Sequence, residues 1–120
     1  MGDLSKNFSR SEFACKCGCG QAIINEELVD VLQRLRDYVE LPIRITSANR
    51  CEKHNANVGG VKDSKHIIGQ AADIQVDGLE PETLYRVLDQ WYPSTYGLGV
   101  YNTFTHIDVR KSKARWDKRG

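Results

Sequence analysis

The chain has 120 residues, a length that suits one domain with a sizeable core and is too short for two cores of typical size. Lys and Arg together number 17 and Asp and Glu 16, so the formal net charge is only +1. This balance excludes a strongly basic coat for nucleic acid and a strongly charged trap for acidic substrates. We therefore expect a single domain over residues 1–120 with no nucleic-acid partner.

The N-terminal segment "MGDLSKNFSRSEF" lacks the apolar core that a secretory signal needs. No run of about 18 apolar residues occurs anywhere in the chain. We therefore expect a protein that is made in the cytoplasm, carries no export signal and has no membrane span.

The chain contains four cysteines: Cys15, Cys17, Cys19 and Cys51. Without an indication of export, reduced thiols or metal ligands are a better interpretation than two disulfides. The "CKCGC" spacing differs from the C-x2-C spacing of zinc knuckles, and a second, structural zinc would require Cys51 to fold back onto the N-terminal segment. Both interpretations, buried thiols and a second metal, stay open.

The first long helix is predicted in "INEELVDVLQRLRDYVELP", with Asn25 as its N-cap and Pro42 as its stop. Its apolar side chains recur at helical spacing, at Leu28, Val31, Leu32, Leu35 and Tyr38. The following "IRITSANR" alternates apolar and polar residues, which predicts a half-buried strand that runs into a loop at Arg50.

A second strand is predicted in "ADIQVDG", and a second helix in "LEPETLYRVLDQWY", where Pro81 suits the first turn. The apolar stripe of that helix consists of Leu84, Val87, Leu88 and Trp91. "GLGVY" and "FTHIDVR" should pair as a hairpin around Asn102 and Thr103. The C-terminal "RKSKARWDKRG" is typical of a solvated, partly frayed tail, with a basic binding patch as the alternative. The pattern predicts an α+β fold in which helices pack on a small, mostly antiparallel sheet.

Three side chains of metal-ligand type lie in three different predicted elements. His66 falls in a turn, Asp73 near the head of the second strand, and His106 in the last strand of the hairpin. Two imidazoles and one carboxylate form a set that zinc accepts, and a catalytic zinc site keeps three protein ligands and one open position. The spacing alone is a weak indication, because solvated His and Asp residues are common in loops.

The segment "SKHIIGQAADI" resembles the S-x-H-x-x-G-x-A-x-D motif of the LAS-type zinc peptidases, the family of D-alanyl-D-alanine carboxypeptidases and of phage and bacterial peptidoglycan peptidases. "PIRITSANRCEKHN" is similar to the family's strand, Ser-x-x-Arg turn and His-Asn, and "THIDVR" is similar to its closing strand. The resemblance extends from about residue 8 to residue 116. It implies the fold shared by hedgehog proteins and D-Ala-D-Ala peptidases.

The resemblance also implies roles for individual residues. His66, Asp73 and His106 correspond to the zinc ligands, and Arg50 to the arginine that binds a peptide carboxylate, a role that suits a bidentate guanidinium. A surface salt bridge is the alternative for Arg50. Ser64 is expected to shape the loop or to touch substrate. His54 and Asn55 are expected to brace the loop after Arg50.

A hydrolytic zinc site also needs a general base. Some family members have an acidic residue three positions before the last zinc histidine and others a histidine two positions before it, but this chain has Thr103 and Phe104 there. Asp108 is the catalytic candidate, because residues i and i+2 of a strand face the same side and Asp108 therefore points where His106 points. The alternative is that Asp108 supports a ligand or pairs with Arg110 or Arg44.

Two hypotheses follow from the resemblance. The first is a zinc peptidase, an endolysin-like enzyme or a carboxypeptidase, that cuts peptidoglycan stem peptides at a bond involving a D-amino acid. The second is a non-catalytic, zinc-stabilised module of the same fold that serves in binding or in virion or cell-wall assembly. We expect a monomer that meets the cell wall through phage-encoded release or as part of a virion.

Overall fold

The fold is described from a computed structural model, in which residues 4–15, 19, 21–51, 55–56, 65–66 and 69–119 are placed. The elements in chain order are α1 (Arg10–Phe13), α2 (Glu26–Val39), β1 (Arg44–Ser47), β2 (Ala71–Gln75), α4 (Pro81–Trp91), β3 (Gly97–Val100), β4 (Thr105–Asp108) and β5 (Ala114–Asp117). Among these described parts, no helix has both the length and the apolar character needed to cross a membrane.

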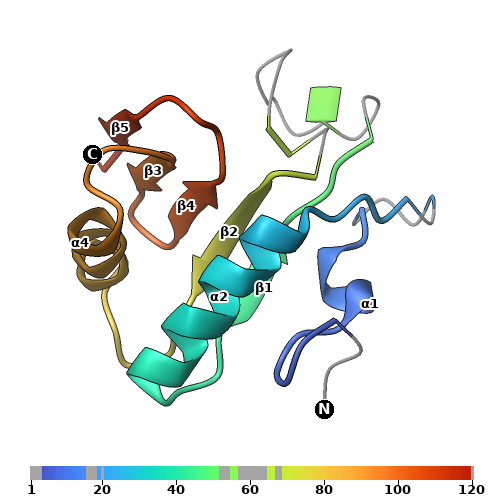
Figure 1. Ribbon diagram of the computed structural model, residues 1–120, viewed down its shortest axis with the longest axis horizontal. Helices are drawn as coiled ribbons and strands as arrows, with labels where there is room; N and C mark the ends of the chain where they lie inside the picture. The colour runs from blue at the N-terminus through green and yellow to red at the C-terminus, as the bar shows by residue number, and fades with distance from the viewer. Residues whose placement is uncertain are drawn as a thin grey trace.

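The five strands form one sheet in the order β1-β2-β4-β3-β5 (Figure 1). All neighbours are antiparallel except β3 and β5, which run parallel. The predicted hairpin is present as β3 and β4, and the backbone N–H of Tyr101 donates to the carbonyl of Phe104 across its turn at 3.0 Å. The sequence prediction of an α+β fold with a mostly antiparallel sheet is confirmed.

The two faces of the sheet differ in chemical character because successive side chains of a strand point to opposite sides. Ile74, Leu98 and Ile107 are fully buried in the main core, together with Leu32 and Leu35 of α2 and Leu84 and Leu88 of α4. One residue away along the same strands, the opposite face carries Asp73, Gly97, Gly99, His106 and Asp108. The helices therefore cover the apolar face, and the polar residues lie on the other.

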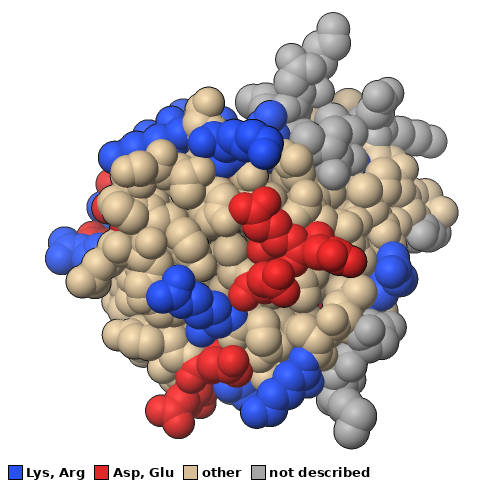
Figure 2. All heavy atoms as spheres, viewed as in Figure 1, with Lys and Arg blue, Asp and Glu red and all other residues tan. Residues whose placement is uncertain are grey.

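Helix α2 begins as the sequence predicts, since the Asn25 side chain accepts hydrogen bonds from the backbone N–H groups of Glu27 and Leu28. Figure 2 shows acidic side chains gathered over the first turns of α2, and Glu26 and Glu27 lie in its first turn, where the helix dipole favours them. Basic side chains lie around them, so this face carries charges of both signs.

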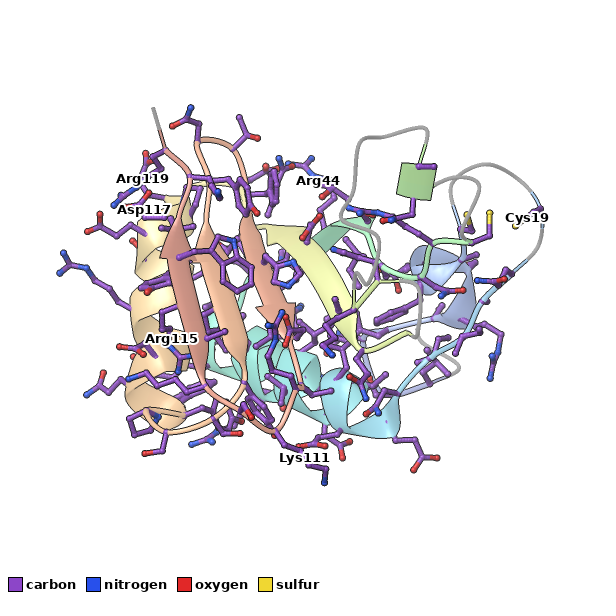
Figure 3. The ribbon with its side chains drawn as sticks, turned by 90° about the horizontal axis from the view of Figure 1, so that it is seen from above. Cys19, Arg44, Lys111, Arg115, Asp117 and Arg119 are labelled. Atoms are coloured by element: carbon purple, nitrogen blue, oxygen red, sulfur yellow. The ribbon has the colours of Figure 1, made fainter. Side chains whose placement is uncertain are left out.

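Two details of the sequence prediction are wrong. Tyr38, assigned to the apolar stripe of α2, is 62% exposed, and its ring instead meets the edge of Trp91 with centroids 5.2 Å apart. The C-terminal segment, predicted as a frayed tail, forms strand β5 at the sheet edge, where Figure 3 shows Arg115, Asp117 and Arg119. Parallel pairing with β3 stabilises this strand, and such a non-local partner leaves little trace in the charged segment itself.

Candidate metal centre

Three potential metal ligands meet on the polar face of the sheet. Asp73 of β2 and His106 of β4 pair directly across the two strands, and His66 lies in a turn that precedes β2. All three side chains are buried, and their ligand atoms lie within 4.8 Å of one another. The structure thus brings together the three residues that the sequence predicts as ligands, although their role in holding the metal stays a prediction.

The distances within this group fit a zinc site. Nε2 of His66 lies 3.3 Å from Oδ1 of Asp73, and Nδ1 of His106 lies 3.0 Å from the same oxygen. Tetrahedral bonds of about 2.0–2.2 Å to zinc would place such ligand atoms about 3.4 Å apart. Little movement is therefore needed for one nitrogen of each imidazole and one carboxylate oxygen to share an ion.

The second nitrogen of each imidazole has a partner that orients the ring. Nδ1 of His66 lies 2.7 Å from the carbonyl oxygen of Ala48, which can only accept, so Nδ1 donates and Nε2 is directed at Asp73. Nε2 of His106 lies 2.8 Å from Oδ2 of Asp108, which leaves Nδ1 directed at Asp73. A carbonyl or carboxylate behind a histidine is the usual support of a metal-bound imidazole.

Asp108 is fully buried. Its Oδ1 accepts from the backbone N–H of Gly97 at 3.1 Å, and Arg110 donates Nε to Oδ1 and Nη2 to Oδ2, each at 2.7 Å. Burial raises the pKa of Asp108, but the hydrogen bonds from His106 and Arg110 outweigh it and hold the pKa well below the usual range. This geometry favours the alternative role, an ionised carboxylate that orients His106.

Burial and hydrogen bonding act in opposite directions on the pKa values of Asp73 and His106. Burial raises the pKa of Asp73, yet the hydrogen bonds and charges of His106 and His66 lower it well below the usual carboxyl range. Burial lowers the pKa of His106, but the hydrogen bonds to Asp108 and Asp73 raise it overall. The carboxylates are thus held in the ionised form that a metal requires, and metal binding at His106 would release a proton.

Arg50 lies beside this group, with its side chain only 13% exposed. Its guanidinium donates to Oγ of Ser47 at 3.1 Å, to Oδ1 of Asn55 at 3.0 Å and to Oδ2 of Asp73 at 3.4 Å. Asp73 therefore presents Oδ1 to the histidines and Oδ2 to Arg50. The alternative prediction of a surface salt bridge does not describe this ion pair, because both partners are largely buried.

Three residues of the sequence prediction, Ser64, His54 and Cys17, lie outside the described residues. Asn55 is described, is buried, and contacts Arg50 as expected of a residue that braces this loop.

One row of paired residues crosses the sheet at the level of the candidate metal ligands. Asp73 pairs with His106, His106 with Gly99, and Gly99 with Trp116 of β5. A Cβ on Gly99 would overlap the indole nitrogen of Trp116, so glycine lets the indole lie over β3 and approach the imidazole of His106, with ring centroids 5.0 Å apart. The sequence prediction missed Trp116. One feature of the sequence could have indicated this contact: glycine occupies every second position of β3, which leaves room for a large side chain to lie across that strand.

Comparison with known proteins gives one match that covers most of the chain. A family model described as Peptidase M15 matches residues 6–108, a range that includes Arg50, His66, Asp73, His106 and Asp108. No curated protein matches the chain.

Proposed function

The chain belongs to the peptidase M15 family of zinc-dependent peptidases, and on that premise we propose that it hydrolyses peptidoglycan stem peptides at a bond that involves a D-amino acid. The observation that carries this proposal is the convergence of Nε2 of His66, Oδ1 of Asp73 and Nδ1 of His106 beside the Arg50 guanidinium. A metal site adjacent to a carboxylate-binding group suits a peptide with a nearby free carboxylate.

In the proposed mechanism, His66, Asp73 and His106 would hold the zinc. A zinc ion bound there would supply a Lewis acid for the scissile carbonyl and would lower the pKa of water toward about 7. Ala48 and Asp108 fix the two imidazole rings, so the ligand nitrogens already point at Asp73 before the ion arrives. The side chains therefore need little rearrangement to bind the ion, so the free-energy cost of forming the site is small.

Arg50 is proposed to recognise the substrate carboxylate. A guanidinium offers two parallel donors and keeps its charge, which suits a carboxylate better than a lysine ammonium does. Its contact with Asp73 is long, at 3.4 Å, so Nη2 can turn toward an incoming carboxylate while Ser47 still anchors Nε. Binding there would hold the peptide next to the metal and bring the scissile bond into reach.

The general base is the least constrained role. That Asp108 takes the proton stays a prediction, and its five contacts with Gly97, His106 and Arg110 suit it better to orienting His106. This full engagement of Asp108 also favours the second candidate function, a zinc-stabilised module of the same fold that binds the cell wall without cutting it.

Digestion of purified peptidoglycan separates the two functions. The zinc-loaded protein is incubated with peptidoglycan and the muropeptides are analysed by mass, with His66→Ala as the matched control. We expect new fragments with the wild type alone. Loss of one terminal residue would indicate a carboxypeptidase, and an internal cut an endopeptidase. Unchanged muropeptides together with retained binding to the sacculus would instead support the non-catalytic module.

The site of action is part of the same proposal. Peptidoglycan lies outside the cytoplasmic membrane, so a protein made in the cytoplasm would meet it through phage-encoded release or within a virion. Monomeric action on a peptide substrate needs no partner chain.

A further inference from the structure

A second group of ligand-type side chains lies away from the sheet. The sulfur atoms of Cys15, Cys19 and Cys51 all lie within 4.8 Å of one another. Cys15, which follows α1, is buried, Cys51 after β1 is half-buried, and Cys19 is exposed. Figure 3 shows Cys19, with sulfur drawn in yellow, at the end of the molecule opposite β5. We call these three residues the cysteine group.

We propose that the cysteine group is a second, structural zinc site. The sulfurs of Cys15 and Cys51 are 3.7 Å apart, much farther than the S–S bond of about 2.05 Å in a disulfide. Two thiolates bound at about 2.3 Å in a tetrahedral zinc site are separated by about 3.8 Å. The observed spacing therefore matches two ligands of one ion. A water or one further side chain would complete the four-coordinate shell.

The backbone around the cysteine group favours thiolates. The N–H of Cys51 donates to the sulfur of Cys15 at 3.4 Å, a contact that stabilises negative charge on the sulfur. Within the N-terminal segment, Cys15 N–H donates to the Gln21 carbonyl at 2.7 Å. Asn49 N–H donates to the Phe13 carbonyl at 3.0 Å and joins this segment to the one that carries Cys51. Zinc binding would displace the thiol protons to solvent and leave three thiolates on the ion.

The position of the cysteine group gives such an ion a structural purpose. It would join two segments that are far apart in the sequence and that have no regular secondary structure of their own at Cys15, Cys19 and Cys51. Cys51 directly follows Arg50, whose backbone N–H donates to the carbonyl of His66 at 3.0 Å. The ion would therefore also fix the loop that carries Arg50. This last consequence rests on the proposed role of Arg50, whereas the metal site itself does not.

Zinc stoichiometry distinguishes the two sites. The protein is purified with a non-thiol reductant, loaded with zinc, desalted and analysed for metal. We expect about two zinc ions per chain in the wild type and about one in each of His66→Ala and Cys51→Ser, since each variant removes a ligand from one four-coordinate site. Replacement of zinc by cobalt should give thiolate-to-cobalt charge-transfer absorption in the wild type and in His66→Ala but not in Cys51→Ser. One zinc in the wild type and none in His66→Ala would overturn the proposal.

A measurement on the wild type alone covers the case in which Cys51→Ser does not fold. The zinc-loaded protein is alkylated with iodoacetamide before and after chelation, and the modified cysteines are located by peptide mass. Cys19 is the informative residue because it is exposed, so burial cannot protect it. We expect Cys19 to react slowly with zinc bound and rapidly after chelation. Equal, rapid alkylation in both states, or a Cys15–Cys51 disulfide in the reduced preparation, would contradict a metal site.

Discussion

The candidate metal centre and the cysteine group each consist of three side chains whose ligand atoms lie within 4.8 Å of one another, but different parts of the fold hold them. Two of the three residues at the candidate metal centre, Asp73 and His106, are paired residues of neighbouring strands. The three cysteines all lie in segments without helix or strand. Hydrogen bonds of the sheet fix Asp73 and His106 in the first group. In the second group, the proposed ion would link segments that no sheet joins. We therefore expect that metal loss abolishes hydrolysis at the centre formed by His66, Asp73 and His106. At the cysteine group, we expect metal loss to reduce the local order of the chain.

The largest expected effect is that of His66→Ala. It should reduce peptide hydrolysis to the level of the metal-free protein, because one of three metal ligands is lost. The fold should persist, since the strands that carry Asp73 and His106 do not depend on His66 for their pairing. Activity, circular dichroism and zinc content check this, with Arg44→Lys as the control, because Arg44 is exposed and pairs with Asp77. If His66→Ala kept full activity, the peptidase reaction would not depend on this candidate metal centre.

Asp108→Asn should have the next largest effect. It tests whether Asp108 orients the metal ligand His106. If Asp108 orients His106, the amide should weaken metal retention and lower activity by roughly 10- to 100-fold, as is typical of partners behind metal ligands. Asp117→Asn in β5 is the matched control, because Asp117 is exposed and contacts Arg119. Metal competition and kcat/KM are measured together. Undiminished zinc affinity with a rate loss of about 10²-fold or more would instead identify Asp108 as the general base.

Arg50→Lys tests the residue that lies between the two ligand groups. We expect kcat/KM to fall roughly tenfold or more for peptides with a free carboxylate at the matching position, because a charge-assisted bidentate contact is lost. Amidated analogues should be affected much less. The control is Arg44→Lys, an exposed arginine on β1 that pairs with Asp77. Equal losses on both kinds of substrate would show that Arg50 supports Asp73 rather than binding the peptide.

The smallest expected effect is that of Trp116→Phe, at the edge of the candidate metal centre. The indole N–H donates to the Tyr101 hydroxyl at 2.9 Å, and a neutral hydrogen bond contributes about 0.5–1.5 kcal/mol to stability. The phenyl ring should still cover His106, so zinc content should not change. Chemical denaturation measures the loss of stability, and Trp91→Phe provides the comparison. Loss of zinc in Trp116→Phe would assign the indole a larger part in holding His106.

The sequence predicts the parts of this fold that local rules determine. Asn25 and the leucine spacing give α2, and the alternation around Ile74 and Ile107 gives the strands that carry Asp73 and His106. Strand β5 was missed because its pairing with β3 is non-local. Tyr38 was misplaced because helical spacing alone does not show how far the core extends toward the end of α2.

For the site, the sequence predicts which residues meet but not how they are held. His66, Asp73 and His106 follow from ligand type and motif. The carbonyl of Ala48 behind His66 could not be predicted, because any residue has a carbonyl and only the chain path brings this one within 2.7 Å. The two-residue offset between His106 and Asp108 predicts a shared side of the strand. Whether Asp108 faces substrate or the ring of His106 depends on Arg110 and Gly97, which occupy its oxygens.

The most direct test of the central claim is a crystal structure of the zinc-loaded protein with diffraction data collected at the zinc absorption edge. We expect an anomalous peak about 2.0–2.2 Å from Nε2 of His66, Oδ1 of Asp73 and Nδ1 of His106. Ala48 and Asp108 should remain hydrogen-bonded to the opposite nitrogens of the two rings. A zinc-replete crystal with no anomalous density between these three atoms, and with both histidines hydrogen-bonded directly to Asp73, would contradict it.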